Sequence, residues 1–185
     1  IPGEDGTLTV YTGTQGIYED YKGIVGVLGV PAEKVKVISA YVGGGFGGKE
    51  DLIVQHHAAL LAWNLKVPVK LTLDRQESIR VHPKRHAFEM DYVVAADADG
   101  HVTAVKADLL QDTGAYASLG GPVLQRACTH GAGPYKIPND EILGTGVYTN
   151  NPPGGAFRGF GVTQSCFAME SCMNLVAKEA GLTPW

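Results

Sequence analysis

The segment that most constrains the fold of this chain is VGGGFGGKED, residues 42–51, in which five of the ten residues are glycine. Glycine readily adopts positive φ angles and allows a ligand or another backbone to approach closely. Successive backbone N–H groups in such a turn can form an anion-binding cradle, most effectively before a helix. The segment therefore predicts either a site lined by backbone or a tight strand-to-helix turn that binds nothing.

Three glycines of this segment match the G-x-G-x-x-G pattern of dinucleotide-binding loops, namely Gly43, Gly45 and Gly48. Asp74, at the end of a predicted strand over 67–74, would be the acid that binds a ribose, although it comes 26 residues after Gly48. A long predicted hairpin then replaces the expected β-α-β continuation. The dinucleotide interpretation is therefore weakened, but it stays open as an alternative.

The same segment also fits G-x-x-x-x-G-K, from Gly43 to Lys49. A nucleoside-triphosphate loop needs Ser or Thr at the next position, because that hydroxyl holds magnesium, and this chain has Glu50 there. A carboxylate at that position would repel the phosphates, so a P-loop is excluded. Phe46 is a bulky exception within the loop, and we expect its ring to pack or to border a pocket.

Hydrophobic periodicity predicts an α+β fold, a mixed sheet with helices packed on it. Strands are expected over 6–14, 34–42, 67–74 and in a long hairpin over 86–117 with its turn at 97–100, and helices over 15–30, 51–66 and 162–181. Gly181 supplies a stop signal for the last helix. With 185 residues and 44% hydrophobic content, the chain 1–185 is expected to form one compact domain of one or two lobes.

Composition narrows the classes of partner. The net charge of −4 provides no general basic surface, so nucleic acid is not an expected partner. No apolar run reaches the roughly 20 residues that span a bilayer, so no membrane partner is expected. The three cysteines are odd in number and lack metal-ligand spacing, which favours a reducing cytoplasm over a disulfide framework. Because the sequence starts at Ile1, we expect a piece of a longer polypeptide.

A second glycine-rich loop, GGAFRGFG at 154–161, has the same character as the first. It contains two aromatic residues, Phe157 and Phe160, which can stack on a planar ring, and Arg158, which can bind an oxyanion or phosphate. Each aromatic taken alone is more commonly a packing residue. Two such loops more than 100 residues apart, both expected to open helices, indicate a ligand shared between them.

Taken together, GGGFGGKE, AFRGFG and the glutamine of YTGTQ resemble the molybdenum-cofactor domain of the xanthine dehydrogenase and aldehyde oxidase family of molybdenum hydroxylases. The resemblance extends over essentially the whole chain and includes LDRQES, KRH and YKIPN. In that family two such domains clasp a molybdopterin, and this chain resembles the first of them.

The resemblance implies a set of cofactor-binding residues. Gln15 matches the glutamine whose amide approaches an oxo ligand of molybdenum. Gly45, Phe46 and Gly47 match the loop whose backbone faces the cofactor, and Arg158 matches the arginine beside the metal. No protein ligand to the metal is implied, because pterin sulfurs and oxo or sulfido groups supply the coordination.

The resemblance also implies substrate-binding and catalytic residues. Glu50 and Arg126 match the two polar residues that grip a purine in xanthine-oxidising members, and Phe160 matches the aromatic that stacks on it. Aldehyde-oxidising members generally lack the polar pair. Without the resemblance, Arg126 would be a surface or capping arginine, and Glu50 an acid at a helix N-terminus. His56 and His57 lie within an apolar helical pattern and are expected to be packed or solvent-facing rather than ligands.

The implied parent enzyme oxidises a purine-like N-heterocycle and takes the oxygen from water. An aldehyde or nicotinate hydroxylase of the same family is the alternative, and outside the family a dinucleotide-binding module or a fragment that binds nothing. The general-base glutamate belongs to the second cofactor domain, and iron–sulfur clusters and FAD belong to other domains or subunits. The chain 1–185 alone is therefore expected to be inactive.

Overall fold

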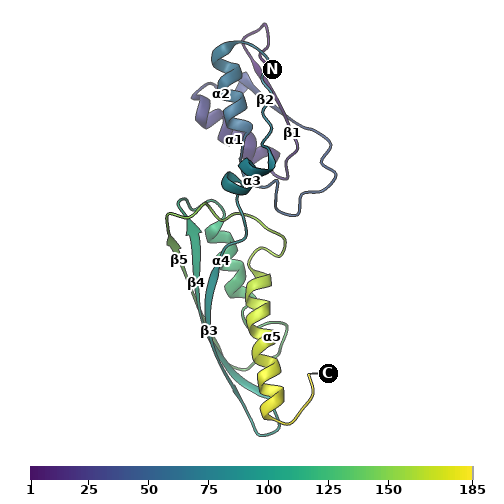
Figure 1. Cartoon of the computed structure of the whole chain (residues 1–185), viewed down its shortest axis with the longest axis vertical. Coiled ribbons are helices and arrows are strands. Elements are labelled where there is room, and N and C mark those ends of the chain that lie inside the picture. The colour runs from purple at the N-terminus through teal and green to yellow at the C-terminus, as the bar shows by residue number, and fades with distance from the viewer. Residues whose placement is uncertain (185) are drawn as a thin grey trace. The chain divides into compact units, whose positions relative to one another are not determined.

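The computed structural model describes residues 1–184, which form two compact units (Figure 1). Unit 1 covers Ile1–Pro83 and unit 2 begins at Lys84. Each unit has a hydrophobic core of its own, around Leu8 and Ile24 in unit 1 and around Leu109 in unit 2. A single domain over 1–185 stays a prediction, and the two units are described separately below.

Unit 1 is built on a parallel pair of strands that are joined through a helix. Its elements are β1 (Leu8–Thr12), α1 (Ile17–Leu28), a 3-10 turn (Ala32–Lys34), β2 (Val35–Ser39), α2 (Gln55–Leu65) and α3 (Arg75–Val81). Leu8 and Val10 of β1, Ile24 of α1 and Ala59 of α2 are buried together in the core. The helices therefore cover one face of the strand pair, as a β-α-β unit requires.

Two predictions in unit 1 are wrong. Residues 67–74 are extended but form no ladder, and Asp74 does not end a strand. Instead, Asp74 is the N-cap of α3: its carboxylate accepts the Glu77 N–H at 2.8 Å, and the Glu77 carboxylate accepts the Asp74 N–H at 2.8 Å. This capping box satisfies two helix-terminal donors, so the sequence after Asp74 is fixed as a helix.

The first glycine loop also does not open a helix directly, because α2 begins only at Gln55. The Gln55 side-chain carbonyl accepts the N–H groups of Ile53 at 2.8 Å and of Val54 at 2.9 Å. Turns fill the residues between the loop and this point. The expected strands over 6–14 and 34–42 and the helices over 15–30 and 51–66 are confirmed with shorter bounds.

Unit 2 is a three-stranded mixed sheet with two helices, which confirms the α+β prediction. The strands are β3 (Phe88–Ala96), β4 (Val102–Gly114) and β5 (Asp140–Tyr148) in the order β3-β4-β5, and the helices are α4 (Gly120–Thr129) and α5 (Val162–Glu179). β4 pairs antiparallel with β3 and parallel with β5. Alternate residues of β4 are buried, because α4 and α5 cover one face of the sheet (Figure 1).

The hairpin over 86–117 and the last helix are confirmed, and Gly181 follows α5 with φ +70°. The sequence did not predict α4 or β5. The first turn of α4 is Gly-Gly-Pro, which has poor intrinsic helix propensity, although proline is tolerated in a first turn. β5 contains Gly144, where a Cβ would collide with Cys128 of α4. Glycine is therefore required at position 144 by the close packing of α4 on β5, although glycine has a poor strand propensity.

The cysteines Cys128, Cys166 and Cys172 are all thiols without a disulfide. Burial raises the pKa of Cys128 and of Cys172, which agrees with packing roles, whereas Cys166 is exposed and does not pack in the core. The rings of His56 and His57 lie 3.9 Å apart between centroids. Within the described part of the chain, no helix combines the length and the apolarity needed to cross a bilayer.

Candidate functional site

Gln15 holds the first glycine loop against the segment that follows β1. Its side-chain carbonyl accepts the backbone N–H of Gly47 at 2.9 Å and that of Lys49 at 3.3 Å, and its Nε2 donates to Glu50 Oε2 at 3.0 Å. The backbone N–H of Gln15 donates to the Lys49 carbonyl at 2.8 Å. These bonds fix the orientation of the amide, and one of the two hydrogens on Nε2 remains for another acceptor.

Gly45 makes this arrangement possible. A Cβ at Gly45 would overlap the Gln15 amide. Glycine at this position therefore leaves space that the Gln15 side chain occupies. Phe46 and Gly47, which follow, both have positive φ, at 55° and 90°. The Phe46 ring is 70% exposed, so it projects from the loop instead of packing in the core. The backbone N–H groups of Gly47 and Lys49, which could have contributed to an anion-binding cradle, donate to Gln15 instead.

Lys49 closes the loop on itself. Its ammonium donates to the Val42 carbonyl at 2.7 Å, across the base of the glycine segment. An ammonium used in this way is not directed at a phosphate. With Asp74 engaged as a helix cap and no helix starting at the loop, the structural context that a dinucleotide fingerprint requires is missing here.

Two further residues of unit 1 that the sequence analysis did not select make hydrogen bonds in this region, and one of them contacts the glycine loop. His82 places its Nε2 2.8 Å from the Gly48 carbonyl, at the end of the glycine loop. Asp20 is only 1% exposed, and it accepts a bond of 3.4 Å from the Gln55 amide. Burial raises the pKa of Asp20, with hydrogen bonds from Thr14 and Gln55 opposing that effect. An acid on the apolar face of a predicted helix was the available sequence signal for Asp20.

The second glycine loop has a similar internal support in unit 2. Arg85 donates to the Arg158 carbonyl at 2.5 Å and to Thr163 Oγ1 at 2.9 Å, and its guanidinium lies 4.4 Å from the centre of the Phe157 ring. The Gly155 N–H donates to the Lys84 carbonyl at 2.8 Å. Arg85 was not selected from the sequence, although it lies in the KRH segment that contributes to the resemblance.

This second loop leads directly into α5, as predicted. Phe160 has φ +51° and is half-buried, and Gly161 is the residue before the helix, with φ +95°. A Cβ at Gly161 would collide with the Val123 carbonyl of α4. The loop therefore packs closely against α4. This helix also contains Arg126, whose side chain is exposed.

The predicted site residues thus fall into two sets, one in each unit. The set in unit 1 is Gln15, Gly45, Phe46, Gly47 and Glu50, and the set in unit 2 is Arg126, Arg158 and Phe160. In the first set, hydrogen bonds join Gln15, Gly47 and Glu50 into what we call the Gln15 cluster, and Gly45 and Phe46 lie in the same loop as Gly47. In the second set, two members share a loop and the third lies on the helix packed against it.

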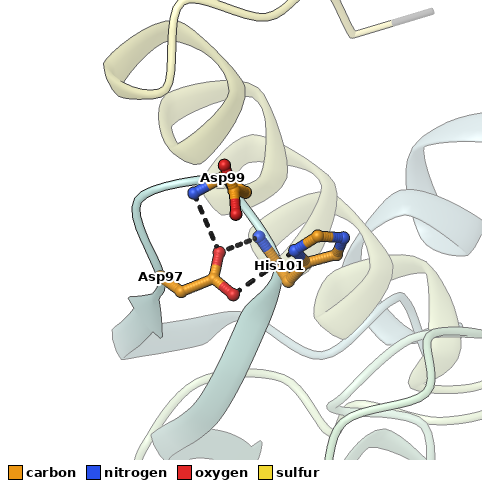
Figure 2. Close-up of side chains that lie close together, drawn as sticks. All are labelled: Asp97, Asp99 and His101. Atoms are coloured by element: carbon orange, nitrogen blue, oxygen red, sulfur yellow. Dashed lines mark hydrogen bonds and ion pairs between the residues drawn. The ribbon is translucent and has the colours of Figure 1, made fainter.

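A group of possible metal ligands lies elsewhere, at the turn between β3 and β4. Figure 2 shows Asp97, Asp99 and His101 close together at this exposed turn. The Asp97 carboxylate accepts the backbone N–H groups of Asp99 at 3.0 Å and His101 at 2.9 Å, and these bonds lower its pKa, the His101 bond most. Asp97 therefore stabilises the turn, and this role accounts for the grouping without a metal.

Comparisons with known proteins decide which family has this combination of loops. A family model described as "Molybdopterin cofactor-binding domain" matches residues 1–185. The chain belongs to this family. The match confirms the resemblance inferred from the two loops and Gln15.

Relatives of this molybdopterin-binding chain include enzyme subunits of known type. It is 47% identical over 180 residues to the "Nicotinate dehydrogenase large molybdopterin subunit" of Eubacterium barkeri, covering 97% of this chain and 42% of that protein. It is 35% identical over 184 residues to "Xanthine dehydrogenase" of Dictyostelium discoideum, covering 98% of this chain and 14% of that protein. The chain thus spans less than half the length of these relatives.

Solved structures show the same fold. The aldehyde oxidoreductase from Desulfovibrio gigas matches with a TM-score of 0.92 at 33% identity, over 98% of this chain and 20% of that one. Quinoline 2-oxidoreductase from Pseudomonas putida 86 matches with a TM-score of 0.85 at 31% identity, over 97% of this chain and 23% of that one. The mixed fold derived above is therefore that of a molybdopterin-binding domain.

The residues of this molybdopterin-binding domain fit such a cofactor. Gln15 presents an amide donor whose carbonyl is already occupied by Gly47 and Lys49, so its orientation toward an acceptor is set in advance. The loops expose bare backbone and one cationic side chain, Arg158.

Proposed function

We propose that this domain is part of a molybdenum hydroxylase that oxidises a purine-like N-heterocycle with oxygen from water. The Gln15 cluster is the observation that supports this proposal most strongly, because a bond of 3.0 Å connects the Gln15 amide, the proposed donor to the cofactor, to Glu50. The parent enzyme would comprise a second molybdopterin-binding domain and electron-transfer domains or subunits with iron–sulfur clusters and FAD. Three thiols without a disulfide agree with a cytoplasmic enzyme.

The cofactor-binding residues would be Gln15, Gly45, Phe46, Gly47 and Arg158. When bound, the molybdenum cofactor supplies oxygen transfer and accepts the electrons. Gln15 would donate its second Nε2 hydrogen to an oxo group, in an orientation that the Gly47 and Lys49 amides hold. Arg158 would contribute a positive charge to cofactor binding, because arginine carries a cationic guanidinium that suits oxyanions.

The substrate-binding and catalytic residues would be Glu50, Arg126 and Phe160. A purine offers ring N–H donors and carbonyl acceptors along its edge, which suit a carboxylate and a guanidinium. Arg126 would also stabilise negative charge that develops on a substrate oxygen. One charge-assisted hydrogen bond is worth about 1.5–3 kcal/mol, or roughly 10- to 150-fold in rate if it forms only in the transition state.

A nicotinate hydroxylase is the second candidate, because the relative at 47% identity is a nicotinate dehydrogenase subunit. The pyridine ring of nicotinate has no N–H at neutral pH, but its carboxylate suits an arginine. Arg126 would then be required while Glu50 would repel the anion. An aldehyde such as benzaldehyde would need neither residue.

The experiment compares kcat/KM for hypoxanthine, nicotinate and benzaldehyde in the parent enzyme and two variants, Arg126→Met and Glu50→Gln. A purine hydroxylase loses hypoxanthine turnover in both variants and retains benzaldehyde turnover. A nicotinate hydroxylase loses nicotinate turnover only with Arg126→Met and improves with Glu50→Gln. Arg80→Met, an exposed arginine of α3, is the matched control.

Molybdenum content is measured for every variant, so that loss of cofactor is not taken for loss of substrate binding. If neither substitution changes the ratio of heterocycle to aldehyde turnover, the two polar residues do not face the substrate, and the purine proposal is replaced by the aldehyde one. The chain 1–185 alone is expected to show no turnover, because the resemblance assigns the general base to a second cofactor domain. Molybdenum-dependent activity of the isolated chain would overturn that expectation.

A further inference from the structure

A cavity of about 740 Å³ in unit 1 lies along β1. Its lining comes from β1 and its continuation to Gly13, from residues 53–62 at and before α2, and from residues 68–71 and Leu73. Ile1, Gly48 and Lys49 also line the cavity, and Lys49 donates a hydrogen bond to the carbonyl of the Gln15 side chain. What fills this cavity therefore bears on how the candidate site is supported.

The edge of β1 that faces the cavity is already paired at one end. Pro2 forms an antiparallel bridge with Leu8, and Ile1 and Thr9 exchange both hydrogen bonds, at 2.8 and 2.9 Å. Backbone groups of alternate residues point to the same edge of a strand. Tyr11 therefore directs its N–H and C=O to the edge that Thr9 uses, and residues 1–184 supply no partner for them.

Residues 67–73, most of which line the cavity, likewise have backbone groups that residues 1–184 leave unpaired. It alternates apolar and polar residues in the manner of a strand, with Val67, Val69, Leu71 and Leu73 in phase. None of these seven residues takes part in a backbone hydrogen bond within the described chain. Val69 nevertheless packs against the core that contains Leu8 and Val10. Five of the seven residues are exposed, so the unpaired backbone groups of this segment are open to pairing with another strand.

We propose that, in the longer parent polypeptide, the residues immediately before Ile1 form a strand that runs antiparallel to β1, fills this cavity and pairs with segment 67–73. The inference rests on the proposal above that the domain is part of a longer chain. The register follows from the existing pairs: the first residue before Ile1 stands opposite Val10, and the second stands opposite Tyr11. The continuity with the Ile1–Thr9 pair favours this occupant over a ligand or a second copy.

The strand would lie against the walls formed by Gly13 and Lys49, and so it would brace the segment that carries Gln15. Its apolar residues would meet the side chains of Val69 and of Leu8 or Val10, according to the face on which they lie. In this arrangement the predicted strand over 67–74 has the right sequence pattern, and only its pairing partner lies outside residues 1–185.

The test is a disulfide cross-link in the full-length parent chain. Tyr11 is 59% exposed, so Tyr11→Cys disturbs little, and the second residue before Ile1 is also changed to cysteine. Directly opposed residues of an antiparallel pair have Cα atoms about 5.5 Å apart, within disulfide range. Peptide mapping after mild oxidation should show this bond in most molecules. The matched control moves the second cysteine to the first residue before Ile1, whose side chain points to the other face, and should give little cross-link.

Amide hydrogen exchange of the same full-length chain, without cysteines added, is the independent measurement. The Tyr11 N–H and alternate N–H groups of segment 67–73, those that point to the new strand, should be protected as ladder amides are. Equal cross-linking of both cysteine pairs, or fast exchange of the Tyr11 amide, would overturn the proposal. Protection without the Tyr11 cross-link would also overturn it, since another segment would then occupy the cavity. These readouts do not depend on activity, so they are separable from a failure of the proposed reaction.

Discussion

The side-chain carbonyl of Gln15 lies 2.9 Å from the backbone nitrogen of Gly47 and accepts its hydrogen bond. The two residues are 32 positions apart in the chain, and their bond joins the end of β1 to the glycine loop. Gln15 is thus a structural residue of the loop as well as a candidate donor to the cofactor. A substitution of Gln15 would change both roles at once, so neighbouring glycines give cleaner tests.

Gly45→Ala should displace the Gln15 amide, because the new Cβ would occupy the space of that amide. Loss of the bonds to Gly47 and Lys49 is expected to cost about 1–2 kcal/mol in the free energy of unfolding. Gly13→Ala is the matched control, since its Cβ would make only an ordinary contact, 4.0 Å from Lys49 Nζ. Thermal unfolding of both variants, with molybdenum content of the parent enzyme, provides the measurement. Equal effects of the two substitutions would show that the position of the Gln15 amide does not depend on the absence of a side chain at Gly45.

Asp74 gives a second test, because its helix cap can be separated from ribose binding. Asp74→Ala removes the cap of α3 and is expected to cost about 1 kcal/mol, whereas Asp74→Asn keeps an acceptor and should cost much less. Urea unfolding of the two variants measures the difference. A dinucleotide site would instead require the carboxylate itself, so binding of NAD that is lost in Asp74→Asn would support the alternative excluded by the geometry.

The contrast between Asp74 and Gln15 shows how far the sequence alone could predict this structure. Local patterns found β1, α1, α2, α5 and the long hairpin, because periodicity and turn residues act over a few positions. The strand predicted over 67–74 did not form, because these residues pair with no strand among residues 1–184, and pairing is not encoded locally. β5 was missed because its sequence contains Gly144, which weakens the strand pattern. Glycine is needed there because a Cβ would collide with Cys128 of α4, and only the tertiary structure shows this contact.

The candidate site divides in the same way. The loops themselves could be predicted, since each concentrates glycines, phenylalanine and one basic residue in a short segment. Their supports could not: Arg85 reaches the second loop from 73 residues away, and His82 reaches Gly48 from 34 residues away. Residues that act through long-range hydrogen bonds have no characteristic spacing in the sequence.

Asp20 makes the stability of unit 1 depend on pH in a specific direction. Burial raises its pKa above the ordinary value of 3.8, so the folded state holds the proton more tightly than the unfolded state. Below about pH 3.8 both states are protonated and Asp20 costs nothing; as the pH rises through the folded pKa, a buried carboxylate forms and stability falls. Asp20→Asn should therefore gain stability relative to wild type as the pH rises from 3 to 7.

The measurement is the free energy of unfolding of both proteins at several pH values between 3 and 7. The Asn oxygen can still accept the bond from the Gln55 amide, so packing is preserved. Asp112, whose pKa is lowered by bonds from Thr149, Asn151 and the Gly114 N–H, favours the folded state at higher pH in both proteins and cancels in the difference. A difference between the proteins that does not change with pH would mean that Asp20 is not buried as an acid.

Two glycines of the α4–α5 contact allow the sharpest comparison in unit 2. At Gly161 the backbone has φ +95°, and a Cβ would collide with the Val123 carbonyl and approach the Ala127 nitrogen to 2.9 Å. Backbone cannot move away as a side-chain tip can, so Gly161→Ala is expected to destabilise unit 2 by about 1–3 kcal/mol. Gly121, in the first turns of α4, has open space around its Cβ position. Gly121→Ala should therefore stabilise the helix by roughly 0.5–1 kcal/mol.

The two alanine variants thus add the same methyl group with opposite expected signs. Thermal unfolding distinguishes them, and the far-ultraviolet circular dichroism of each variant checks that α4 and α5 persist. If Gly161→Ala unfolds at the wild-type temperature, the second loop must shift without cost, and α4 is not the element that fixes the position of Arg158 and Phe160. If it is destabilised as expected, the closeness of α5 to α4 sets the geometry of the loop, because no side chain fits between them.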